Sequence, residues 1–123
     1  MSTQVLIVDD SKVSRMLIKA MMLARHPEWE CAEVDNGEKA LLHLASNPVD
    51  LVTMDVNMPG MNGLEAAAQI KQLQPKAFIA IMTANVQSAT RQRAEQIGVR
   101  FFGKPITEDI IAQVIQCFEN EHA

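Results

Sequence analysis

Short apolar runs alternate along the chain with longer segments in which apolar residues recur every three or four positions. The runs have the length and composition of strands covered on both faces, and the longer segments have the period of amphipathic helices. The predicted strands cover residues 4–8, 29–34, 50–55, 77–82 and 99–102. The predicted helices lie between Ser11 and Pro27 and over residues 38–46, 64–73, 86–97 and 110–118.

The alternation of five strands with five helices over short connections predicts the fold class. It is typical of an α/β domain with a parallel sheet and helices on both faces. Right-handed crossovers leave few topologies, and the working site of such a sheet lies at the carboxyl ends of its strands. A length of 123 residues predicts one domain, residues 1–123, with a single core.

Polar residues suited to phosphoryl or metal chemistry stand at four of the predicted strand ends. Asp9 and Asp10 follow the first strand, Asp55 ends the third, Thr83 follows the fourth and Lys104 follows the fifth. Three carboxylates brought together repel one another unless a cation joins them, and oxygen ligands suit Mg²⁺. Asp55 is the best candidate nucleophile toward phosphorus, with Lys104 and Thr83 as phosphoryl contacts. Taken alone, each of these residues also fits an ordinary turn or surface role.

The first predicted helix has apolar residues on more than one side. Val13 and Leu17 recur at helical spacing, and we expect them to face the sheet. Ile18 and Met22 would then point outward beside the site. Exposed apolar residues in such a place suggest a docking surface for a protein partner.

Charge and cysteine content narrow the function classes. The net charge is −4, and the basic residues are scattered, which argues against a nucleic-acid binder. No apolar run approaches the roughly 20 residues that span a bilayer, so we expect no membrane association. Cys31 and Cys117 match no metal or redox spacing. They favour two reduced, buried thiols and a cytoplasmic location.

The ordered set of strand-end residues resembles the receiver domain of two-component response regulators, of the single-domain, chemotaxis-regulator type. The matching residues are Asp9-Asp10, Asp55 followed by Asn57-Met58-Pro59-Gly60, Thr83-Ala84 and Lys104-Pro105. The resemblance extends over essentially the whole chain. It implies a flavodoxin-like, doubly wound, five-stranded parallel sheet with strand order 2-1-3-4-5. It also implies a phosphorylation-activated signalling domain, and not an enzyme in its own right.

The same resemblance implies roles for individual residues. Asp55 would accept a phosphoryl group from a sensor histidine kinase or a phosphotransfer protein, and Lys104 would contact that group. Mg²⁺ would be bound by Asp9, Asp10, Asp55 and the backbone carbonyl of Asn57. The Lys104-Pro105 peptide bond is expected to be cis. The positions expected to dock the kinase are Ser14, Ile18, Met22 and Ile106.

A switch completes the set that the resemblance implies. Thr83 and Phe101 would form the switch pair, with a phenylalanine where the aromatic is often tyrosine, since the chain has no tyrosine. The helix predicted over 86–97 has few apolar anchors, so we expect it to shift at low cost. Residues 98–102 lack the acidic pair found where transcription-factor receivers dimerise. We therefore expect a monomer whose activated form binds a different, unidentified protein.

Other function classes fit the sequence less well. A phosphatase or phosphotransferase with an aspartate nucleophile usually carries Asp-x-Asp, whereas Asn57 stands two residues after Asp55. A flavin module would need a hydroxyl- and glycine-rich loop after the first strand, where this chain has two aspartates. A receiver that acts without phosphorylation is disfavoured by the complete acceptor set. A receiver fragment of a larger regulator remains an alternative to a complete single-domain protein.

Overall fold

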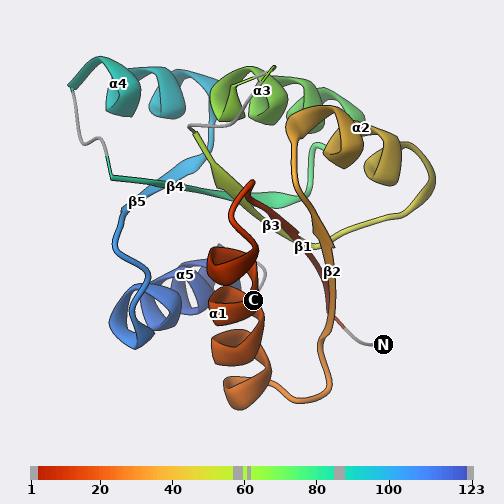
Figure 1. Cartoon of the computed structure of the whole chain (residues 1–123). Coiled ribbons are helices and arrows are strands. Elements are labelled where there is room, and N and C mark those ends of the chain that lie inside the picture. The colour runs from red at the N-terminus through yellow and green to blue at the C-terminus, as the bar shows by residue number, and fades with distance from the viewer. Residues whose placement is uncertain (1–2, 57–59, 61, 85–87, 122–123) are drawn as a thin grey trace.

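Five parallel strands form one sheet that lies between two layers of helices (Figure 1). The computed structural model describes residues 3–56, 60, 62–84 and 88–121. The strand order is β2-β1-β3-β4-β5, so the predicted fold class is confirmed. The elements are β1 (Gln4–Val8), α1 (Lys12–Arg25), β2 (Glu30–Val34), α2 (Gly37–Ser46), β3 (Leu51–Asp55), α3 (Gly63–Leu73), β4 (Phe78–Thr83), α4 (Ser88–Ile97), β5 (Arg100–Gly103) and α5 (Glu108–Glu121).

The two faces of the sheet carry separate cores because successive strand residues point to opposite sides. Helices α2, α3 and α4 cover one face, and α1 and α5 cover the other (Figure 1). Along β3, Val52 and Met54 pack into the first core, while Leu51 packs into the second. The central strands β1, β3 and β4 are almost wholly buried, which explains their near-continuous apolar sequences.

Local sequence signals set several helix ends. The Ser11 hydroxyl accepts a hydrogen bond from the backbone N–H of Ser14 and so caps α1, as predicted. Asn36 and Asn62 cap α2 and α3 in the same way. Gly98 has a φ of +87° and closes α4, with its N–H bonded to the carbonyl of Ala94. The strands and helices therefore start and stop close to where the sequence predicts.

The orientation predicted for α1 is wrong. Ile18 and Met22 are buried in the core beneath α1 and α5, whereas Val13 and Leu17 are exposed over 66% and 43% of their surface. The helix is apolar on most sides, so its periodicity alone does not fix its rotation about its axis. Packing against the sheet and α5 buries the side that carries Ile18 and Met22. The docking role predicted for Ile18 and Met22 loses its basis, since neither side chain reaches the surface.

Among its described residues helix α4 has few buried apolar side chains, as the sequence indicates. Ala94 is fully buried, Ile97 packs at the edge of the core, and Ala89 is exposed. Val86, the first residue of the helix predicted over 86–97, lies outside the described residues. None of the helices in the described part of the chain combines the length and apolar character that a bilayer crossing requires.

Candidate functional site

Three carboxylates converge at the carboxyl edge of the sheet. Val8 of β1 pairs with Met54 of β3, so the next residues on these neighbouring strands, Asp9 and Asp55, stand side by side. One oxygen each of Asp9, Asp10 and Asp55 can be chosen so that all three lie within 4.8 Å of one another. Asp9 and Asp55 are buried, and Asp10 is exposed. The parallel topology thus assembles the acidic cluster that the sequence predicts.

The ammonium group of Lys104 contacts this cluster. The Nζ atom of Lys104 lies 3.3 Å from Oδ2 of Asp9 and 3.6 Å from Oδ1 of Asp55. Its side chain is 20% exposed, while those of Asp9 and Asp55 are 2% and 8% exposed. Three carboxylates against one ammonium leave the cluster with a net negative charge. A hard divalent cation with oxygen ligands fits this donor set.

The β4 and β5 ends complete the site. Thr83, the last residue of β4, is fully buried and pairs with Gly103 across the sheet. The backbone N–H of Lys104 donates to the carbonyl of Thr83 at 2.8 Å, which fixes the start of the lysine-bearing segment. The Lys104-Pro105 peptide bond is cis, as the resemblance implies. Thr83 and Lys104 therefore reach the same edge from neighbouring strands.

The backbone beneath Asp55 is held by the start of α3. The N–H of Gly63 donates to the carbonyl of Val56 at 3.0 Å, and the helix approaches so closely that a Cβ at Gly63 would lie 2.8 Å from the Cα of Val56. It would lie closer still to the carbonyl oxygen of Asp55. Only glycine allows this approach. Sequence reasoning does not single out Gly63, because a glycine near a loop has many ordinary explanations.

Phe101, which the resemblance implies as the switch aromatic, lies on β5. Phe101 is half-buried at the edge of the core under α4, and the guanidinium carbon of Arg91 lies 5.5 Å from the centre of its ring. This cation–π contact joins α4 to β5. Asn57, expected to supply a backbone ligand, lies outside the described residues. Ser14 and Ile106, expected as docking positions, are both half-buried.

The cysteines take no part in this site. Cys31 and Cys117 are free and half-buried. Burial raises the pKa of the Cys31 thiol, the nearby charge of Lys19 lowers it by less, and the carboxylate of Glu33 raises it by less again. A raised pKa keeps a thiol protonated and weakly nucleophilic at neutral pH. The sequence predicts buried thiols, and this is wrong in degree, since both side chains are only half-buried.

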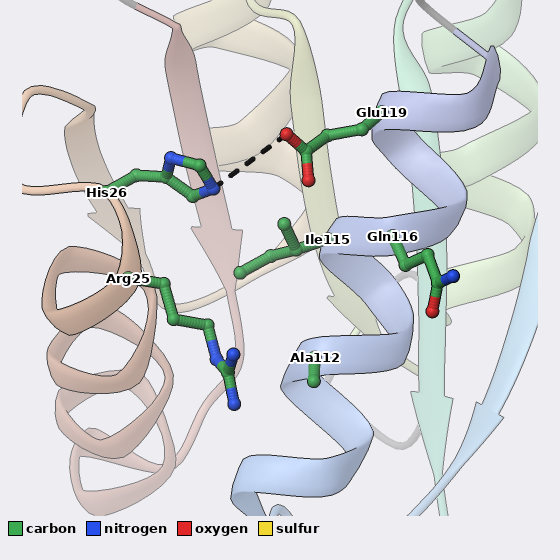
Figure 2. Close-up of a pocket in the computed structure, with 6 residues that line it drawn as sticks. All are labelled: Arg25, His26, Ala112, Ile115, Gln116 and Glu119. Atoms are coloured by element: carbon green, nitrogen blue, oxygen red, sulfur yellow. Dashed lines mark ion pairs between the residues drawn. The ribbon is translucent and has the colours of Figure 1, made fainter.

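A cavity of about 500 Å³ lies at the opposite edge of the molecule, between the C-terminal halves of α1 and α5 (Figure 2). Arg25 and His26 line it from α1, and Ile115 and Glu119 line it from α5. His26 Nε2 lies 4.0 Å from Oε2 of Glu119, and the imidazole stacks on Trp29 with ring centres 4.1 Å apart. The cavity contains none of the carboxylates that form the strand-end cluster.

Comparisons with known proteins agree with this geometry. The family model for the response regulator receiver domain matches residues 5–116. The chemotaxis protein CheY of Bacillus subtilis is 36% identical over 116 residues, which cover 94% of this chain and 96% of that protein. The sensor histidine kinase RcsC of Salmonella typhimurium is 30% identical over 115 residues, or 93% of this chain but only 12% of the kinase.

Solved structures agree on the fold. The CheY-like receiver domain protein of Methanospirillum hungatei superimposes with a TM-score of 0.91 at 17% identity, covering 99% of this chain and 98% of that one. Parallel strands in the same order, an acidic cluster at their carboxyl ends and a family match over most of the length point to one conclusion. The chain belongs to the family of response regulator receiver domains.

Proposed function

We propose that Asp55 is the phosphorylation site of this receiver domain. The observation that carries the proposal is the meeting of Asp55 with Asp9, Asp10 and Lys104 at one edge of the sheet. Asp55 ends the central strand β3, and its side chain is 8% exposed. Most of the side chain is therefore enclosed by its surroundings, and a small part stays open to solvent.

Mg²⁺ is the cation that we propose for the acidic cluster. Asp9, Asp10 and Asp55 would hold it, with the backbone carbonyl of Asn57 as the further ligand that the family resemblance implies. When bound, Mg²⁺ neutralises charge on the phosphoryl oxygens and on the carboxylates, which otherwise repel both each other and the donor. The excess of carboxylates over ammonium groups among the described residues of the site supports this assignment.

The chain's own residues then perform a phosphoryl transfer. A carboxylate oxygen of Asp55 attacks the phosphorus of a phosphohistidine, the P–N bond breaks, and its electron pair stays on the imidazole of the donor. Lys104, now paired with Asp9 and Asp55, is within reach of a phosphoryl oxygen on Asp55. The domain thus assists its own phosphorylation and dephosphorylation, and we propose no other enzymatic activity for it.

We propose that Thr83 and Phe101 transmit the modification. The Thr83 hydroxyl would turn toward the phosphoryl group, and Phe101 would move inward into the space released. The half-buried position of Phe101 and the light anchoring of α4 support this motion, because both cost little to rearrange. The surface of α4, β5 and α5 would then present a new face to a protein target.

The kinase docking surface that we propose is the exposed apolar strip of α1. Val13, Met16 and Leu17 are 66%, 56% and 43% exposed, and they lie in the half of α1 that begins beside Asp9 and Asp10. They take the place of the buried Ile18 and Met22, while Ser14 and Ile106 stay as half-buried members of this surface. The partner is a sensor histidine kinase or a phosphotransfer protein.

We further propose that residues 1–123 form one receiver domain and that the protein is a monomer. We also propose a cytoplasmic location, which the two free thiols support.

The test is phosphorylation by acetyl phosphate with and without Mg²⁺. Intact mass should show one added phosphoryl group that requires Mg²⁺, and Asp55→Asn should abolish it because an amide cannot act as the nucleophile. Asp109→Asn, the same change at an exposed position of α5, is the matched control and should be labelled normally. Full labelling of Asp55→Asn, or labelling of the native chain that is indifferent to Mg²⁺, would contradict the proposal.

A further inference from the structure

The side chain of Arg15 reaches back from α1 to the backbone of Asp9. Its Nη1 atom donates to the carbonyl oxygen of Asp9 at 2.7 Å, and its Nε lies 3.2 Å from Oε1 of Glu33 on β2. The side chain is only 16% exposed. The guanidinium of Arg15 therefore connects Glu33, on the edge strand β2, with Asp9, the first residue of the acidic cluster.

Within the described part of the chain, Asp9 is held by hydrogen bonds of two kinds, to its carboxylate and to its backbone. The carboxylate accepts from the N–H of Ser11 at 2.9 Å and from Lys104 Nζ at 3.3 Å. The backbone N–H donates to the carbonyl of Val34 at 3.2 Å, and the backbone carbonyl accepts from Arg15. A cation that binds the carboxylate competes with the Lys104 contact. The two backbone contacts involve no carboxylate oxygen and can persist in both states.

We propose that Arg15, oriented by Glu33, is a positioning residue that aims the carboxylates of Asp9 and Asp10 at the divalent cation. The inference rests on the proposed function, since it presupposes that these carboxylates bind Mg²⁺. The carbonyl of Asp9 belongs to the peptide unit that joins Asp9 to Asp10. Holding that carbonyl fixes the plane of the peptide and, with it, the directions in which both side chains leave the backbone.

Arginine suits this task because of its shape. A planar guanidinium presents several donors in a fixed fork, so it can bind a carbonyl and a carboxylate at once in a set geometry. Lysine has the same charge but donates from one flexible point. Glu33 is shared, since Lys19 Nζ lies 3.7 Å from its other carboxylate oxygen. A lysine at position 15 would therefore keep the local charge while losing the bridge between Glu33 and Asp9.

The charge-preserving variant Arg15→Lys separates positioning from electrostatics. Removing the positive charge altogether would favour a nearby cation, and this would mask the loss of alignment. With the charge kept, we expect the Kd for Mg²⁺ to rise by about threefold to tenfold, the range that one hydrogen bond spans. Calorimetric titration of the full chain with MgCl₂ measures this directly. The rate of phosphorylation by acetyl phosphate should fall at low Mg²⁺ and recover at saturating Mg²⁺.

The matched control is Arg100→Lys. Arg100 Nε pairs with Glu121 at 2.7 Å on the surface, away from the acidic cluster, so the same change there should leave the Kd for Mg²⁺ unaltered. If Arg15→Lys binds Mg²⁺ as tightly as Arg100→Lys does, the inference is wrong, even if its Tm is lower. Should Arg15→Lys not fold, Glu33→Asp takes its place, because it keeps the charge but shortens the side chain that orients Arg15. A higher Kd for Mg²⁺ is then expected, and an unchanged Kd would refute the role. Absence of Mg²⁺ binding by the native chain, or native affinity in Asp9→Asn, would instead overturn the proposed function.

Discussion

Adding one methyl group at Gly63 should displace Asp55, the proposed phosphorylation site. Gly63 opens α3 and packs directly over the peptide that follows Asp55. A Cβ at this position would lie 2.8 Å from the Cα of Val56, about 0.7 Å inside the ~3.5 Å at which carbon atoms pack. The nearest atom is the carbonyl oxygen of Asp55, closer still. Backbone atoms cannot rotate away, so either α3 or the end of β3 has to move.

The size of the effect follows from this geometry. Forcing an extra methyl group into a packed site costs about 1–3 kcal/mol, which for a domain of this size is a fall in Tm of about 4–12 °C. The loss in the rate of phosphorylation should be larger than this loss of stability alone would suggest. A displacement of about 1 Å at a reacting group can lower the rate about 100-fold, and here the displaced carbonyl belongs to Asp55. We therefore expect Gly63→Ala to fold and yet accept phosphate slowly.

The assay compares Gly63→Ala with Gly103→Ala. Gly103 ends β5 and pairs with Thr83. Apart from its two chain neighbours, no described residue has an atom within 4 Å of a Cβ added there. Thermal unfolding gives the stability of each variant, and acetyl phosphate with saturating Mg²⁺ gives the rate. Gly103→Ala should match the native protein in stability. If Gly63→Ala were as stable and as quickly phosphorylated as Gly103→Ala, the close approach of α3 to the backbone of Asp55 would not be what positions this residue.

Two further predictions concern stability. Thr53 is 1% exposed, and its hydroxyl has no hydrogen-bond partner among the described residues, so Thr53→Val should raise the free energy of unfolding by about 1 kcal/mol in a urea titration; a lower stability would mean that the hydroxyl is satisfied after all. Leu17→Glu on the exposed side of α1 should change stability by no more than about 0.5 kcal/mol, whereas Ile18→Glu should cost about 3 kcal/mol or more. Equal losses from these two would contradict the observed rotation of α1.

The acidic site could be predicted from sequence because its members sit at strand ends. In a parallel sheet every carboxyl end lies on one edge, so Asp9, Asp55 and Lys104 meet there without any knowledge of side-chain packing. The capping residues Ser11 and Gly98 could be predicted for a similar reason, since each acts within one turn of its own position. Burial could not be predicted for α1, because both of its sides are apolar enough to face a core.

The sequence by itself determined the strands, the helices, the layers that their alternation allows and the residue types at the carboxyl edge of the sheet. These features depend on periodicity and on turn chemistry, which act between near neighbours in the chain. Only the tertiary structure decided which side of α1 is buried, that Arg15 supports the carbonyl of Asp9, and that Gly63 bears on the backbone of Asp55. Each of these depends on how segments from different elements pack in three dimensions, and a pattern within one segment cannot predict that packing.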